Sequence, residues 1–70
     1  MNKNKLRRDI FKRLNEFKTD AKKFEYEELT EMVIFLLHLY GYGENVIYYG
    51  GFIEKCVYEW AILNDIKLKK

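Results

Sequence analysis

The chain has 70 residues and a formal net charge of +2, with 49% hydrophobic and 34% charged residues. Because a domain usually has about 100 residues or more, this length predicts one domain spanning residues 1–70 and excludes a second. The only cysteine, Cys56, and the only histidine, His38, exclude an internal disulfide and a zinc site built from nitrogen and sulfur ligands.

The hydrophobic residues are distributed along the chain rather than gathered in one long block. The longest apolar run, residues 32–40, is well short of the roughly 20 residues of a membrane-spanning helix. The basic N-terminus is followed by an amphipathic segment rather than by the apolar block of a secretory signal. We therefore expect a cytoplasmic protein that does not use a membrane.

Apolar residues near the N-terminus recur every three or four positions, as they do on one face of a helix. The series is Leu6, Ile10, Leu14, Phe17 and Ala21. It predicts a helix that is capped by Asn4 and ends either near Phe17 or near Lys23. Residues 22–27 alternate polar and aromatic side chains and are predicted to be a linker.

A second helix is predicted for residues 27–40, with acidic residues at its start, where the helix dipole favours them, and Gly41 just after its end. This segment is apolar on nearly all sides, and such a helix must be covered all round. We expect it to lie in the middle of the domain and to complete its burial in a homodimer. The residues expected to mediate this self-association are Ile34, Phe35, His38 and Leu39.

The remaining residues predict a turn at residues 41–45 and a third helix from Phe52 onward. Its inward face is expected to hold Ile53, Cys56, Val57, Trp60 and Leu63, with Tyr58 on the opposite side. Residues 45–51 are either the first turns of this helix or a short extended piece that pairs with residues 24–26, and the sequence favours the helix. The predicted fold is therefore all-α, a compact three-helix domain.

Charge is strongly segregated along the sequence. Residues 1–23 hold nine basic and three acidic residues, a net charge of +6, whereas residues 24–65 hold one basic and eight acidic residues, a net charge of −7. The basic side chains opposite the apolar face of the first helix form a stripe of Arg7, Arg8, Lys12, Lys18 and Lys22. Such a stripe is most simply a solvated face that pairs in part with the acidic residues 25–31, but it also fits the phosphates of a nucleic acid. The lysines of residues 67–70 add to this second interpretation.

Aromatic rings are concentrated in one short, glycine-rich segment. Four glycines accompany Tyr40, Tyr42, Tyr48, Tyr49 and Phe52 within thirteen residues. Rings of this kind pack in a core or a dimer, form the contact points of a protein partner, or stack on the base of a nucleotide.

Residues suited to catalysis are scarce. The chain has no serine, and its single cysteine and histidine lie in apolar helical stretches. We therefore expect no enzyme, no cofactor and no metal. The sequence predicts a small non-enzymatic helical binding protein, most directly a regulator or inhibitor that acts on a protein partner and comes from a phage or mobile element. The alternatives are a nucleic-acid-binding protein that uses the basic first helix, and a nucleotide-binding sponge that uses the tyrosine- and glycine-rich segment.

Overall fold

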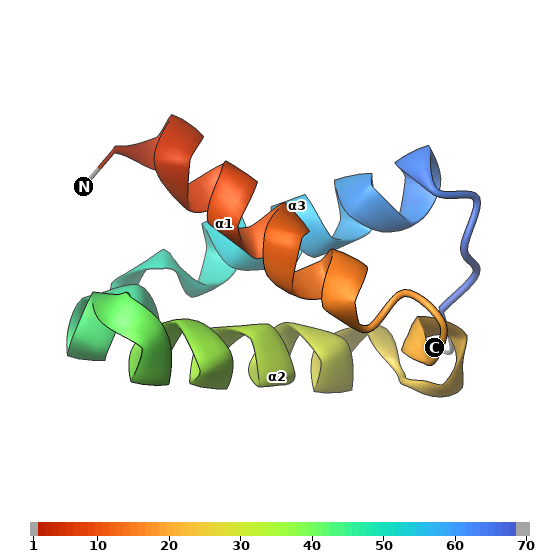
Figure 1. The fold of residues 1–70 in the computed structure, drawn as a ribbon, viewed down its shortest axis with the longest axis horizontal. Coiled ribbons are helices and arrows are strands. Elements are labelled where there is room, and N and C mark those ends of the chain that lie inside the picture. Colours follow the sequence, from red (N-terminus) through yellow and green to blue (C-terminus); the bar gives the residue numbers. More distant parts are fainter. Residues whose placement is uncertain (1, 69–70) are drawn as a thin grey trace.

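The computed structural model describes residues 2–68, and these residues form helices joined by short turns, with no β-strand. The α-helices are α1 (Lys3–Glu16), α2 (Tyr26–Leu37) and α3 (Gly50–Leu63), of which α1 and α3 are the longest at 14 residues each. Between them lie the 3-10 helix η1 (Ala21–Lys23), the π-helical turn η2 (His38–Tyr42) and the 3-10 helix η3 (Gly43–Tyr49) (Figure 1). The predicted all-α class is confirmed, but the described chain contains short 3-10 and π-helical segments in addition to the α-helices.

Helix α1 begins and ends at different residues from those predicted. The side-chain Oδ1 of Asn2, rather than that of Asn4, caps the helix by accepting hydrogen bonds from the backbone N–H groups of Asn4 at 2.9 Å and Lys5 at 3.1 Å. The helix ends at Glu16, because Phe17 leaves the helical conformation with φ −106° and ψ 10°. The buried face of α1 consists of Leu6, Ile10 and Leu14, as the spacing predicted.

Helix α2 is displaced towards the N-terminus relative to the prediction. It begins at Tyr26, inside the predicted linker, and the carboxylate of Glu28 accepts a hydrogen bond of 2.9 Å from the backbone N–H of Glu25 just before it. Its last residue is Leu37 rather than Tyr40, since Tyr40 and Gly41 have non-helical dihedral angles. Gly41 has a φ of 128°, a backbone conformation that residues with a side chain rarely adopt.

Residues 43–49 are helical rather than extended, but they are not the first turns of α3 that the sequence favoured. They form the separate 3-10 helix η3, and they make no strand pairing with residues 24–26. Val46 is the buried residue of η3 and anchors it to the core.

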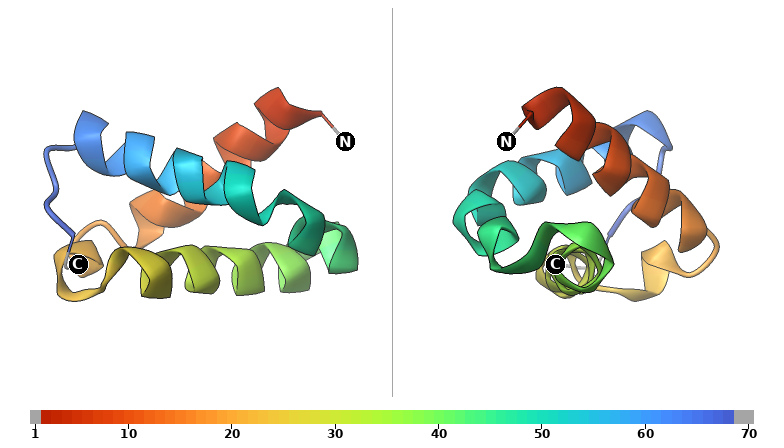
Figure 2. Two further views of the ribbon diagram at one scale, coloured as in Figure 1. Left: turned by 180° about the vertical axis from the view of Figure 1, so that it is seen from behind. Right: turned by 60° about the vertical axis from the view of Figure 1, so that its left-hand side comes forward.

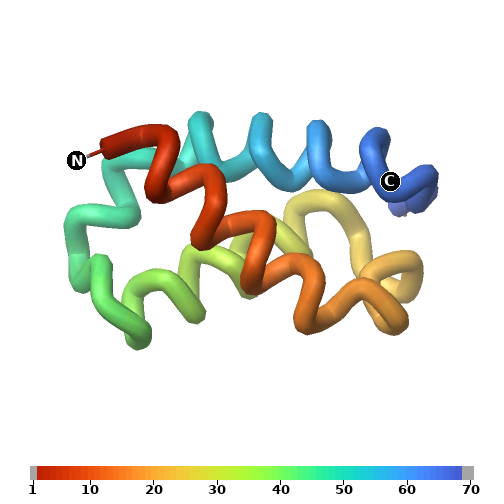
Figure 3. Tube along the Cα trace, turned by 45° about the horizontal axis from the view of Figure 1, so that its top comes forward, coloured from red at the N-terminus to blue at the C-terminus, as the bar shows by residue number. Residues whose placement is uncertain are grey.

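The three α-helices form the corners of a triangle, with α1 lying across the other two (Figures 2 and 3). Helix α2 therefore lies at one edge of the molecule and not in the middle, as the sequence analysis had expected. Two short neighbours cannot surround a third helix, so part of α2 stays open to solvent. Helix α3 supplies five residues to the core: Ile53, Cys56, Val57, Trp60 and Ala61. Leu63, which was expected on this face, is exposed.

The chain turns sharply after α3. Asp65 has a left-handed backbone, with φ 53°, and its N–H donates to the carbonyl of Ile62 at 3.1 Å. The N–H of Ile66 donates to the carbonyl of Ala61 at 2.9 Å, which completes a Schellman motif. Ile66 and Leu68 consequently pack back against the core. No helix within residues 2–68 has both the length and the apolar character needed to cross a bilayer.

Candidate partner-binding surface

Two of the five rings predicted to bind a partner are open to solvent. Tyr40 on η2 is 62% exposed and Tyr48 on η3 is 86% exposed, the largest fraction among the exposed large apolar side chains. The guanidinium of Arg13 lies 4.9 Å from the centre of the Tyr40 ring and supports it from α1. Ile47 is exposed beside Tyr48, because the inward packing of Val46 turns the following residues outward. We refer to Leu39, Tyr40, Ile47 and Tyr48 as the Tyr48 surface.

Tyr42 has a structural role instead. It is half-buried, and its hydroxyl donates a hydrogen bond to the carboxylate of Asp9 on α1. Burial, followed by this hydrogen bond and the negative charge of Asp9, raises the pKa of Tyr42 to about 12. The ring therefore ties η2 to α1, and its hydroxyl is already engaged within the chain.

Tyr49 and Phe52 also differ from the prediction, since both are half-buried and pack against the core. The ammonium group of Lys3 lies 5.7 Å from the centre of the Phe52 ring. The sequence could not separate these rings from Tyr40 and Tyr48, because the direction of each side chain depends on where η2 and η3 bend.

The residues predicted for self-association differ in their exposure. Phe35, His38 and Leu39 are exposed and Ile34 is half-buried. Ile34 lines one shallow hollow with Thr30, and Phe35 lines another with Phe24 and Met32. Glu31 borders both hollows.

A second apolar surface lies on α3, where the sequence analysis placed no site. Tyr58 and Ile62 are 58% and 62% exposed. The ring of Tyr58 meets that of Tyr26 edge to face, with ring centres 6.0 Å apart and an interplanar angle of 86°. The sequence does contain a signal for this surface. Tyr58 and Ile62 lie four residues apart, on the side of α3 away from the buried residues.

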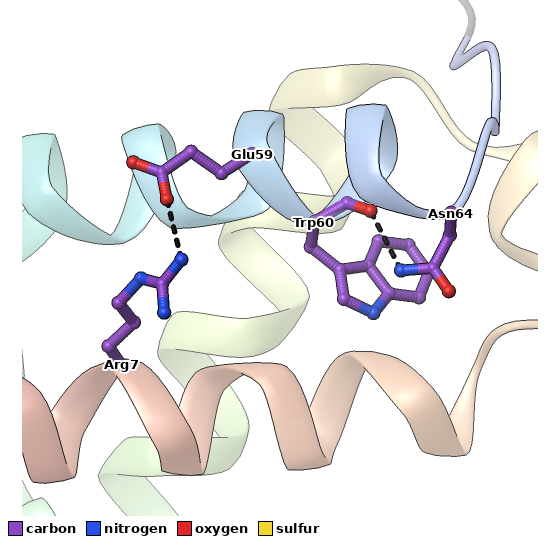
Figure 4. Close-up of polar contacts among 4 residues, drawn as sticks. All are labelled: Arg7, Glu59, Trp60 and Asn64. Atoms are coloured by element: carbon purple, nitrogen blue, oxygen red, sulfur yellow. Dashed lines mark hydrogen bonds and ion pairs between the residues drawn. The ribbon is translucent and has the colours of Figure 1, made fainter.

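The basic stripe is only partly available to a ligand. Arg7 forms an ion pair of 2.9 Å with Glu59 on α3 (Figure 4), and its guanidinium lies 4.4 Å from the centre of the Phe11 ring. The other four members are exposed and make no ion pair with any residue in the range 2–68: Arg8, Lys12, Lys18 and Lys22. No ion pair within that range joins α1 to residues 25–31 either, so the expected pairing with the acidic segment is not seen. Lys69 and Lys70 of the basic tail lie outside the described residues.

Cysteine and histidine, the side chains that most often act in catalysis, lie in different environments in this chain. Cys56 is buried in α3, where burial, followed by the charge of Glu59, raises the pKa of its thiol. His38 is exposed on η2. Within the described part of the chain, no three His, Cys, Asp or Glu side chains are grouped so that they could hold a metal ion.

Comparison of the chain with models of protein families, with curated proteins and with solved structures gives no match.

Proposed function

We propose that this chain is a small non-enzymatic binding protein that regulates or inhibits a larger protein by occupying part of its surface. The observation that carries the proposal is the exposure of Tyr48, at 86%, together with the exposure of Leu39, Tyr40 and Ile47 on η2 and η3. Large aromatic side chains dominate the binding energy of protein interfaces, whereas an isolated domain gains nothing from leaving them in water.

The charge of the surrounding chain indicates the chemistry of the partner. Residues 24–65 carry a net charge of −7, and Glu44 is exposed within η3. Opposite charges around an interface steer the two proteins together and disfavour incorrect partners. We therefore expect the partner to present an apolar cleft bordered by lysine or arginine side chains.

The proposal is tested by capture with matched tyrosine variants. Immobilised wild type and Tyr58→Ala should both retain the same partner from the native host, whereas Tyr40→Ala with Tyr48→Ala should lose it. Tyr58 is a suitable control because it is an exposed tyrosine on another surface. Tyr42 is left unchanged, because replacing it would remove its hydrogen bond to Asp9. With the purified partner, the double variant should bind at least about tenfold more weakly, as expected for the loss of aromatic contact residues. Equal binding by all three proteins would contradict the proposal.

Nucleic-acid binding is the second candidate, and the four exposed cations of the basic stripe support it. If they contact phosphates, retardation of DNA should fall steeply between about 50 and 200 mM salt. Arg8→Glu with Lys12→Glu should weaken it further, whereas Lys55→Glu on α3 is the matched control. Absence of retardation at low salt would exclude this candidate.

Three further expectations stay predictions: a homodimer, nucleotide binding, and the location and origin of the protein. For the homodimer, Phe35 and Leu39 are exposed, which makes them available to a second copy and to a different protein alike. Nucleotide binding would have to use Tyr40 and Tyr48, since Tyr42 and Tyr49 are half-buried, and calorimetry with a panel of nucleotides tests it. A cytoplasmic location and a phage or mobile-element origin are part of the proposal and rest on the sequence alone.

A further inference from the structure

One row of side chains on α2 is open to solvent. The helix runs along one edge of the molecule, with no other segment beyond it (Figure 1). All members of the row are exposed except Met32, which is half-buried, and the row consists of Glu28, Glu31, Met32, Phe35, His38 and Leu39. Their spacing of three or four residues places them on one face, because the helical conformation continues through Leu39 and breaks only at Tyr40. We refer to these six residues as the α2 stripe.

The α2 stripe contains a hole of the kind found between packed helices. A hollow of about 440 Å³ is lined by Glu28, Glu31, Met32 and Phe35, with Phe24 as its fifth lining residue. The first four follow the spacing i, i+3, i+4, i+7. Four residues in this arrangement form the hole that receives one side chain of a facing helix. The hollow therefore fits an apolar side chain that a second helix presents.

The same stripe also carries a side chain that fits this hole. Leu39 is 55% exposed, and Phe35, midway along the row, is 60% exposed. The hole is centred between positions 31 and 32, about as far before Phe35 as Leu39 lies after it. When a second α2 runs antiparallel, with the two Phe35 side chains at the centre, Leu39 of each copy enters the hole of the other. One row thus supplies both halves of a self-complementary contact.

The polar groups of the stripe agree with this antiparallel register. Viewed down the helix, Glu31 and His38 lie on one flank of Phe35, and Met32 and Leu39 lie on the other. A two-fold axis midway between two antiparallel helices brings each flank against the same flank of the second copy. Along the helix axis, Glu31 then lies within one residue rise, about 1.5 Å, of the second copy's His38. An imidazole N–H can donate to a carboxylate, and within residues 2–68 neither side chain is already held in an ion pair.

We propose that a second copy of this chain packs on the α2 stripe, with the two α2 helices antiparallel about a two-fold axis at Phe35. Such an interface uses the same surface on both copies, which is the commonest arrangement in small oligomers. A second copy supplies the inserted side chain, the hole and both polar partners from one row of residues, whereas a different protein would need a matching row of its own. The proposal rests on the homodimer expected above and assigns its interface.

Three of the four residues predicted for self-association take part in this interface: Phe35, His38 and Leu39. Ile34 does not, because it lies on another side of α2, where it lines a hollow with Thr30. The apolar contacts are instead completed by Met32, which lies on the same flank as Leu39 and within one residue rise of the second copy's Leu39.

The length of the α2 stripe sets the expected affinity. From Glu28 to Leu39 the helix is about 17 Å long, at about 1.5 Å per residue. One helix face of that length is smaller than the roughly 800 Å² that each partner contributes to a standard interface. We therefore expect a dimer with a dissociation constant in the micromolar range or weaker.

Sedimentation equilibrium between about 10 µM and 1 mM tests whether copies associate at this stripe. The mean mass of the wild type should rise from 8.6 kDa towards about twice that value. Phe35→Glu should abolish the rise, because it places two carboxylates against each other at the axis. Ile62→Glu makes the same change at an exposed apolar residue of α3 and should associate as the wild type does. A wild type that stays monomeric, or a Phe35→Glu variant that still associates, would overturn the proposal.

Exchanging the two polar partners tests the register. Glu31→Lys and His38→Glu should each weaken association by about tenfold, because each variant disrupts two contacts across the axis. The double variant restores a complementary pair and should recover to within about threefold of the wild type. Positions 31 and 38 are about 10 Å apart along one helix, so this recovery cannot arise within a single copy.

Both exchanged side chains are exposed, so circular dichroism should show the same helix content in the two single variants and the double variant. A double variant that associates no better than either single variant would show that the copies do not meet in this register, and the proposal would be wrong.

The proposed function is tested separately from this interface. Leu39 belongs both to the α2 stripe and to the Tyr48 surface, so none of the variants alters it. Tyr40→Ala with Tyr48→Ala should lose the protein partner and still associate, whereas Phe35→Glu should retain the protein partner and stay monomeric. If the tyrosine double variant lost self-association while Phe35→Glu kept it, the copies would meet at the Tyr48 surface and the α2 proposal would fail.

Discussion

The indole N–H of Trp60 donates a hydrogen bond of 2.8 Å to the side-chain Oδ1 of Asn15, and this bond joins α3 to α1. Trp60 is the largest fully buried side chain, with 1% of its surface exposed, whereas Asn15 is exposed. In Figure 4 the Trp60 ring points from α3 towards α1, while its backbone carbonyl accepts a hydrogen bond of 2.8 Å from the side-chain amide of Asn64. The only polar group of the largest buried ring, the Trp60 indole N–H, therefore has its hydrogen-bond acceptor on a single exposed residue, Asn15.

Replacing Asn15 by leucine should destabilise the fold, because it leaves the indole N–H without its acceptor. We expect the free energy of unfolding to fall by about 1–2 kcal/mol. In a Trp60→Phe background the same replacement should cost almost nothing, since the donor is already gone. Urea unfolding of the four proteins measures the difference. An equal loss in both backgrounds would show that the hydrogen bond does not contribute.

The contact between Tyr42 and Asp9 predicts a loss of stability at alkaline pH. The pKa of Tyr42 is raised from 10.0 to about 12 in the folded chain, so the folded state holds this proton where the unfolded state has released it. The resulting stabilisation is complete below pH 10 and is lost as the pH rises from 10 to about 12.

Thermal unfolding across this range measures the effect. Tyr42→Phe should show a shallower alkaline decline than wild type, because the titrating hydroxyl is absent. Tyr48→Phe removes an exposed hydroxyl and serves as the control, with a profile that should follow wild type. Identical profiles for wild type and Tyr42→Phe would contradict the prediction.

Asp65 occupies a position that favours glycine. It has a left-handed backbone, and its negative charge lies just past the C-terminal end of α3, where the helix dipole is unfavourable to it. Asp65→Gly should therefore raise the free energy of unfolding by about 1 kcal/mol, and Asp65→Asn by less. Asp65→Ala should lower it. Chemical denaturation measures the three values, and a less stable glycine variant would mean that the aspartate side chain has a compensating contact.

The ion pair between Arg7 and Glu59 should contribute little to stability. Its side chains are 43% and 50% exposed, and water weakens such pairs. Glu59→Gln should reduce the free energy of unfolding by less than about 1 kcal/mol, and the reduction should vanish at about 1 M salt. Leu14→Ala, which creates a cavity in the core, should cost about 2–5 kcal/mol. A loss above about 2 kcal/mol for Glu59→Gln would contradict this ranking.

The buried faces of the helices were predictable, because residues that face the core recur every three or four positions in the sequence. Leu6, Ile10 and Leu14 recur at helical spacing, and all three are buried. The ends of the helices were not predictable in the same way. Ala21 continues the spacing and is buried although α1 ends at Glu16, because the 3-10 helix η1 also returns a side chain to the core.

The candidate surfaces were predictable only as segments. Tyr40, Tyr42, Tyr48 and Tyr49 are chemically alike, and tertiary packing decides which of them face solvent. The pairing of Tyr42 with Asp9 joins residues 33 positions apart, which no local pattern indicates. The exposed Tyr58 and Ile62 on α3 were missed for a related reason, since the apolar character of Ile62 is compatible with either side of a helix until the position of α1 is known.

The burial of Cys56 gives the protein a built-in reporter. Its thiol is enclosed where α3 packs against the rest of the core, and it is the only sulfhydryl in the chain. A disulfide reagent can reach it only when α3 separates from its neighbours, so the labelling rate measures how often the domain opens. A single colorimetric assay can therefore rank every variant described above by resistance to opening, without an added dye or tag.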